Sequence, residues 1–91
     1  MSEFISIEYR SQIQLALSAV AAQTAALPLG KYDIISTVDC YIKIDVVAND
    51  VTVNTGYPLF AGNQITVDVT SQRKIGAIST VAGTLTIHRV Q

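Results

Sequence analysis

Charged residues are scarce in this 91-residue chain: Lys, Arg, Asp and Glu together make up 14% of it, whereas an average soluble domain has roughly 25%. The 6 basic residues nearly balance the 7 acidic ones, and the formal net charge is -1. A protein that neutralises phosphates needs a basic stripe, and this sequence has none, so we expect no nucleic-acid partner. A surface so poor in charge is typical of a subunit inside an assembly.

Residues that carry chemistry are equally rare. The chain has one cysteine and one histidine, so it has no intrachain disulfide and no sign of an oxidised, secreted scaffold. Cys40 falls among apolar residues at alternate positions, which predicts a buried, inert thiol. The single histidine, His88, falls on the polar side of its segment. Asp33 and Asp45 are interpreted as solvated acids rather than a catalytic pair. We expect a non-enzymatic protein without metal or cofactor.

Long apolar runs are missing as well. No uninterrupted stretch approaches the roughly 20 residues that cross a bilayer, and the first residues carry Glu3 and Glu8 where a signal peptide would be basic and then apolar. We therefore expect no membrane partner, and a protein that is made and used in the cytoplasm or in a particle assembled there.

What the sequence does contain is a period-two alternation of apolar and polar residues from about residue 31 onward. Ile65, Val67 and Val69 alternate with polar neighbours, as do Leu85 and Ile87. Since successive side chains of a strand point to opposite faces, each run predicts a strand with one buried face. Turn signals separate seven or eight such runs at spacings of roughly 8 to 12 residues. This predicts an all-β fold, a small antiparallel β-sandwich or jelly-roll-like barrel.

The domain organisation is simple: residues 11–91 are expected to form one β-sandwich, and residues 1–10 an N-terminal arm or edge strand. In this first segment Ile5, Ile7 and Tyr9 alternate with Ser6 and Glu8. Terminal segments are poorly tied down unless they pair with something, so an arm that pairs with a partner fits the pattern.

Residues 12–26 fit two periods. The alternation of Ile13, Leu15 and Leu17 predicts a strand, whereas six alanines and a helical stripe favour a helix. A full capping box is missing. Because the rest of the chain is so consistently β, we expect a strand from about Gln12 to Val20.

Two irregular places carry further expectations. Residues 48–56, with Val51 and Val53, are predicted to form a short exposed excursion between strands. Gly76 interrupts an otherwise strand-like run, which indicates a bulge or a close approach of another backbone.

Some apolar residues fall at positions where the alternation predicts the solvent-exposed face of a strand. Ile35, Tyr41 and Ile78 are expected to point outward, which indicates a second buried surface and hence oligomerisation. The expected interface residues are Phe4, Ile5, Ile7, Tyr9, Ile35, Tyr41, Tyr57 and Ile78.

The tyrosines also admit a binding role, since aromatic faces stack on sugar rings. A carbohydrate- or receptor-binding module would use Tyr41, Tyr57 and the loop 49–56. Packing of Tyr41 on a neighbouring subunit or loop is the favoured alternative.

Three stretches together resemble small virion proteins of tailed bacteriophages. These are Gly30–Ile44, with its Ser-Thr-x-Asp-Cys-aromatic turn and strand; Tyr57–Asn63, with its Leu-x-Ala-Gly turn; and the threonine-rich Gly83–His88. The resemblance covers about residues 27–90. It implies a compact β-sandwich that serves as a capsid decoration or cement protein, or as an accessory protein of the head, tail or fibre. The arm and the excursion 48–56 lie outside the shared pattern.

The sequence thus predicts a virion protein assembled in the host cytoplasm, which decorates or cements a capsid as a homo-oligomer. We expect this oligomer to be a trimer, in contact with the major capsid protein or another virion protein. The alternative is a tail- or fibre-associated adaptor or a carbohydrate- or receptor-binding module.

Overall fold

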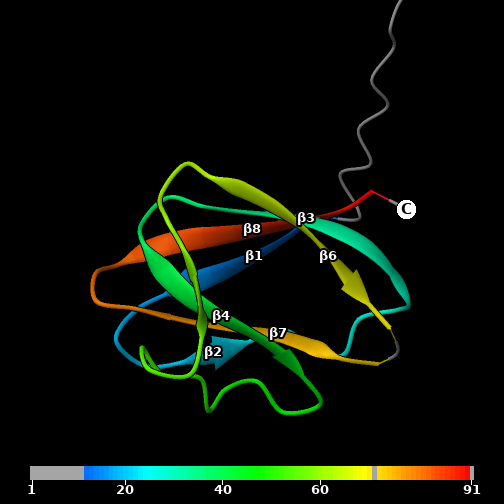
Figure 1. The fold of residues 1–91 in the computed structure, drawn as a ribbon, viewed down its shortest axis with the longest axis horizontal. Coiled ribbons are helices and arrows are strands. Elements are labelled where there is room, and N and C mark those ends of the chain that lie inside the picture. Colours follow the sequence, from blue (N-terminus) through cyan, green and yellow to red (C-terminus); the bar gives the residue numbers. More distant parts are fainter. Residues whose placement is uncertain (1–11, 71, 91) are drawn as a thin grey trace, which may run out of the picture.

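A computed structural model describes residues 12–70 and 72–90, which form eight strands (Figure 1). They are β1 (Gln12–Leu17), β2 (Ala22–Gln23), β3 (Gly30–Ser36), β4 (Cys40–Asp45), β5 (Tyr57–Leu59), β6 (Gln64–Val69), β7 (Lys74–Ser79) and β8 (Gly83–Arg89). Phe4, Ile5, Ile7 and Tyr9 of the predicted arm lie outside the described residues. The described ranges hold no helix long and apolar enough to cross a membrane.

The strands pair in a nested order. Sheet A has the order β1-β8-β3-β6 and sheet B the order β2-β7-β4-β5, and all pairs are antiparallel. The first strand pairs with the last, the second with the seventh, the third with the sixth, and the fourth with the fifth. The chain is therefore one long hairpin, rolled so that successive pairs fall alternately in the two sheets. This is the jelly-roll form of a β-sandwich, one of the two all-β forms that the sequence left open.

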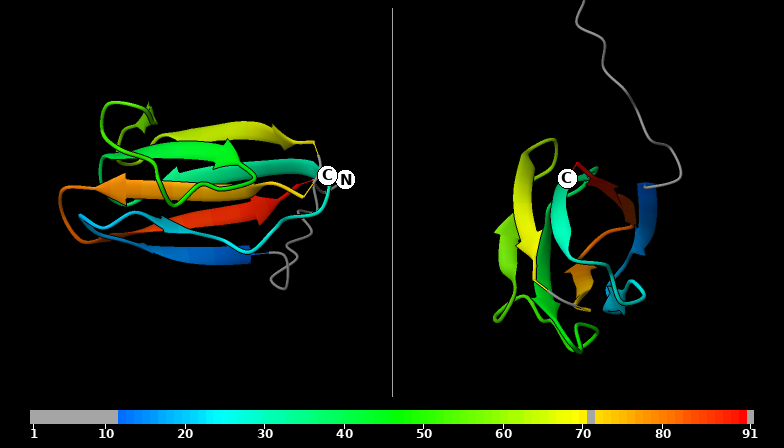
Figure 2. Two further views of the ribbon diagram at one scale, coloured as in Figure 1. Left: turned by 90° about the horizontal axis from the view of Figure 1, so that it is seen from below. Right: turned by 90° about the vertical axis from the view of Figure 1, so that its right-hand side faces the viewer.

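The core lies between the two sheets, which face each other in the end-on view of Figure 2. In β3, Tyr32 and Ile34 turn inward and are buried, whereas Lys31 and Ile35 turn outward and are exposed. The Tyr32 hydroxyl donates a hydrogen bond of 2.8 Å to the carbonyl of Pro28, so no polar atom of this ring is left without a partner. The buried apolar cluster consists of Leu17, Leu27, Tyr32, Ile34, Cys40, Ile42, Leu59, Val69, Ile75, Ala77, Leu85 and Ile87.

The ambiguous region 12–26 is β-structure, as expected, but the strand is shorter than predicted. β1 ends at Leu17, where the Oγ of Ser18 accepts a hydrogen bond from the backbone N–H of Val20 and closes a turn. A second short strand, β2, follows. All six residues of β1 pair with β8, so the pairing overrides the helix propensity of the alanines.

The prediction of an exposed excursion at residues 48–56 is wrong for part of that segment. Ala48 and Val51 are 0% and 2% exposed. The side-chain Oε1 of Gln23 accepts hydrogen bonds from the backbone N–H groups of Ala48 and Asn49 at 3.0 and 3.1 Å. These bonds tie the segment to β2, and they supply partners for backbone groups that a covered loop would otherwise lack.

Gly76 explains how the segment fits there. In β7, Gly76 pairs with Lys43 of β4, and a Cβ on this glycine would collide with the backbone of Ala48. Of the two expected causes for this glycine, the structure shows the close backbone approach. The segment after β4 therefore covers part of the outer face of sheet B.

Candidate functional site

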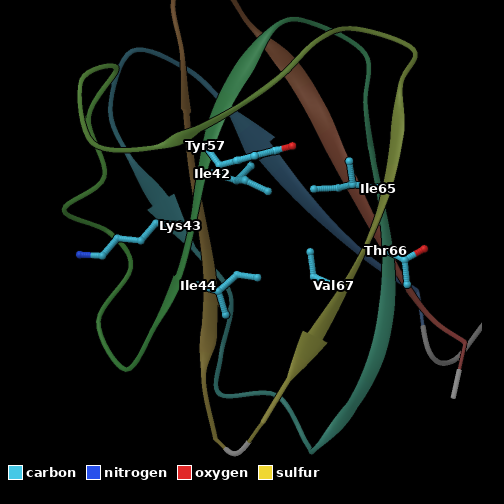
Figure 3. A pocket seen from close by; sticks show the side chains of 7 residues that line it. All are labelled: Ile42, Lys43, Ile44, Tyr57, Ile65, Thr66 and Val67. Atoms are coloured by element: carbon cyan, nitrogen blue, oxygen red, sulfur yellow. The ribbon is translucent and has the colours of Figure 1, made fainter.

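The two sheets part along one side of the sandwich, between β4 and β6. On this side β5 has three residues and pairs with β4 only from Cys40 to Ile42. The remaining residues of β4, Lys43 to Asp45, have no strand partner on this side among the described residues. The opening that results is a groove with a volume of about 520 Å³ (Figure 3).

The groove is lined mainly by apolar residues from both sheets, and Lys43 and Thr66 also border it. Ile42 and Ile44 of β4 point across it toward Ile65 and Val67 of β6, and the ring of Tyr57 lies over one end (Figure 3). Ile42 is 3% exposed, and Tyr57 is 60% exposed. Ile44, Ile65 and Val67 are half-buried and pack against the core. The floor of the groove is therefore part of the hydrophobic core, which is exposed here because no strand covers it.

The backbone beside the groove is also open. β6 is hydrogen-bonded to β3 along one side, and none of the described residues pairs with its other side. An edge strand of this kind presents unpaired N–H and C=O groups that another strand can use. The groove thus combines apolar pockets with a line of backbone donors and acceptors.

The charged side chains at the rim of the groove form ion pairs with each other outside the groove. The Lys43 side chain points out of the groove (Figure 3), and its ammonium lies 2.6 Å from a carboxylate oxygen of Asp50. This hydrogen bond raises the pKa of Lys43 and lowers the pKa of Asp50. Asp45 lies 3.4 Å from Arg73. No charged side chain of the described residues enters the groove, so the groove suits apolar groups rather than acid–base chemistry.

The outer face of sheet A has a different character. Asp33 accepts a hydrogen bond of 2.6 Å from the Thr66 hydroxyl and one of 3.2 Å from the Gln64 side-chain amide. Lys31 pairs with Asp68 at 2.9 Å. Around them, at outward positions of the neighbouring strands, lie Gln12, Gln14, Thr84, Thr86 and His88. This face is polar and internally hydrogen-bonded.

The predicted interface residues within the described part fall on three separate surfaces. Ile35 is 38% exposed and lies on the polar face of sheet A. Tyr41 and Ile78 are cross-strand neighbours on the outer face of sheet B, both half-buried. Tyr57 lies at the groove. The expected outward direction of Ile35, Tyr41 and Ile78 is confirmed, but the structure does not bring the predicted residues together.

Sequence reasoning missed Ile44, Ile65 and Val67 as site residues. Their alternation marks them as core, and nothing local shows that the strand that should cover them stops early. The signal in the sequence is the proline of Tyr57-Pro58-Leu59, since proline has no N–H to continue a ladder.

The three tyrosines in the described part of the chain, Tyr32, Tyr41 and Tyr57, do not form a common shelf. Tyr32 is buried. Tyr57 pairs with the inward-facing Ile42, whereas Pro58 pairs with Tyr41. Residues directly opposite each other in a sheet share a face, so Tyr41 and Tyr57 point to opposite sides of sheet B. The two rings cannot stack on one sugar.

Asp33 and Asp45, the two acids considered above as a pair, lie apart as well. Asp33 lies on the outer face of sheet A, and Asp45 lies in sheet B beside Arg73, so the two carboxylates do not meet. Within residues 12–70 and 72–90 no three His, Cys, Asp or Glu residues cluster in a way that could hold a metal ion.

Cys40 is a buried core residue, as predicted, and its thiol should be unreactive. It is 2% exposed, and burial raises its pKa; the hydrogen bond with Ser36 acts in the opposite direction. Because the thiolate is the nucleophile, iodoacetamide at pH 8 should alkylate the native protein at least about a hundredfold more slowly than the chain unfolded in urea. Mass spectrometry of the carbamidomethylated chain measures both rates, and equal rates would contradict the burial.

Comparison of the chain with family models, with curated proteins and with solved structures finds no match. The function is therefore inferred from the sequence and from the surfaces of the molecule.

Proposed function

We propose that this chain is a non-enzymatic structural protein of a bacteriophage particle. It decorates or cements the capsid through contacts with copies of itself, as a trimer, and with the major capsid protein or another virion protein. Its place is the virion, which is assembled in the host cytoplasm.

The groove between β4 and β6 supports the part of this proposal that concerns assembly with other chains, and the resemblance of residues 27–90 to phage virion proteins supports the part that concerns the particle. It is an apolar opening beside a free strand edge, which favours contacts with another chain over the binding of a polar substrate. Apolar contact area contributes about 25 cal/mol per Å² before association costs are subtracted. A protein that seals joints between subunits needs surfaces of this kind.

Exposed apolar residues elsewhere add support. At the end of the sandwich where β7 turns into β8, Val81 is 55% exposed, and Phe60 of the β5–β6 turn is 59% exposed. Val20 is 76% exposed. It lies near this end as well, because the N–H of Ser79, just before Val81, donates a hydrogen bond to the carbonyl of Ser18, just before Val20. The low charge of the chain also agrees with the proposal. Jelly rolls occur in viral capsid domains, which supports the proposal by analogy of fold.

The test is to look for the protein in purified particles. Phage particles induced from the strain that carries the gene are banded in a density gradient and analysed by quantitative mass spectrometry. We expect this chain in the particle band at many copies per particle, and genes for head proteins beside its own gene. If the chain stays in the soluble fraction while the major capsid protein bands, the proposal is wrong. Enrichment in tail-only fractions would instead favour the tail-associated alternative.

A further inference from the structure

The free side of β6 offers a regular site for one more strand. β6 turns Ile65, Val67 and Val69 inward at alternate positions, and the first two line the groove. A strand added to this edge would gain backbone hydrogen bonds and would place every second side chain between β6 and β4. This is the physical basis of strand addition, in which alternate pockets select the side chains.

The chain itself contains a segment with the matching pattern. Ile5, Ile7 and Tyr9 are apolar at the same two-residue spacing, and Ser6 and Glu8 between them are polar. We propose that residues 4–10 of a second copy of this chain add as a strand to the free edge of β6 and insert Ile5, Ile7 and Tyr9 into the groove. This inference requires self-association, and it holds whether or not the oligomer belongs to a phage particle.

The length of the segment decides in favour of a second copy. β1 and β6 are the opposite edges of sheet A (Figure 2), and strands lie about 4.8 Å apart. A strand beyond β6 is thus about 19 Å from Gln12 along the sheet. Tyr9 precedes Gln12 by three residue steps, which span at most about 11 Å. Tyr9 cannot enter the groove of its own chain.

Charge favours an antiparallel orientation of the added strand. In a parallel register with Ile7 opposite Val67, Glu8 would lie opposite Asp68, and like charges directly opposite destabilise a sheet. In the antiparallel register, Glu8 lies opposite Thr66 and Ser6 opposite Asp68. The antiparallel strand also continues the pattern of every other pair in sheet A.

This contact has a consequence for assembly. The donor segment leaves from the β1 edge, and the acceptor groove lies on the β6 side, so the contact joins two different surfaces. Contacts of this type close into rings or continue as open filaments. A closed ring of three chains would give the trimer of the proposed function.

Pairs of introduced cysteines test the contact directly. One chain carries Ile7→Cys and another carries Val67→Cys. Both keep the buried Cys40, and the unaltered chain shows how much linked dimer forms through Cys40 alone. Under mild oxidation we expect the mixture to form a disulfide-linked dimer. The matched control pairs Ile7→Cys with Thr66→Cys, whose side chain points away from the groove (Figure 3). We expect at least about tenfold more linked dimer from the Val67→Cys mixture than from the control, because paired thiols react at a raised effective concentration.

Two results would overturn the proposal. The first is an equal yield with Thr66→Cys. The second comes from a chain carrying both Ile7→Cys and Val67→Cys: if it forms an internal disulfide in a monomer rather than links between chains, the segment binds its own chain.

Sedimentation provides an independent measurement. The unaltered protein is expected to sediment at a multiple of its 9.8 kDa mass. Val67→Lys and deletion of residues 1–10 should each raise the dissociation constant at least about tenfold, since each removes the apolar contact. Thr66→Lys should not raise it, because this substitution lies on the outer face and puts a positive charge opposite Glu8 of the added strand. A monomeric unaltered protein, or equal effects of Val67→Lys and Thr66→Lys, would contradict the inference. These results are separate from the presence of the protein in particles, which tests the proposed function.

Discussion

Replacing Ile34 with alanine is expected to lower the free energy of unfolding by about 3 to 4 kcal/mol. Ile34 is 0% exposed and lies in the core cluster, in a strand paired on both sides. The shortened side chain leaves a cavity in the core between the two sheets, which are too closely packed to move fully into it. Urea denaturation followed by circular dichroism measures the difference.

The next residue supplies the control. Ile35 is 38% exposed on the outer face of sheet A, so Ile35→Ala should cost less than about 1 kcal/mol in the isolated chain. The two substitutions remove the same atoms one position apart and differ only in the face of the strand. Similar losses at both positions would contradict the side-chain directions of β3.

Gly76→Ala is expected to destabilise the protein by about 3 kcal/mol and to release the segment after β4. The new methyl group would meet the backbone of Ala48, which cannot move without breaking the hydrogen bonds to the Gln23 side chain. We therefore expect faster hydrogen exchange at the amides of Ala48 and Asn49, together with cleavage of the segment by a low concentration of protease.

Gly62→Ala is the matched substitution. Gly62 has a φ of 82°, and no atom lies within 4 Å of the position that its Cβ would take. The cost is then about 1 kcal/mol, from the left-handed backbone conformation alone. If Gly76→Ala is no worse than Gly62→Ala and the segment stays protected, Ala48 does not pack on β7.

Much of the fold could be predicted from the sequence, because alternation is a local property of the chain. A strand turns successive side chains to opposite faces wherever it lies, so the pattern at Ile34 and Ile35, or around Cys40, gives the buried side without knowledge of the neighbours. The same pattern placed Ile35, Tyr41 and Ile78 on outer faces. It also favoured a strand from about Gln12 to Val20 against the alanine content, and the structure has this strand as far as Leu17.

The covered segment after β4 could not be predicted in this way. Ala48 and Val51 lie outside any alternating run long enough to predict a strand. The burial of Ala48 depends on Gly76 and Gln23, which are distant in sequence and reach it only in the folded chain. A loop without periodicity carries no local sign of what it packs on.

The sequence by itself determined the class of the fold and the inward or outward direction of most strand residues, because both follow from backbone geometry within a few residues. Only the tertiary structure decided which strands pair and where pairing stops. Ile44 and Val67 have the pattern of core residues, yet they line an open groove because β5 ends after three residues and β6 lies at an edge. Whether a patterned residue is covered depends on its neighbour across the sheet, and that neighbour is set by non-local contacts.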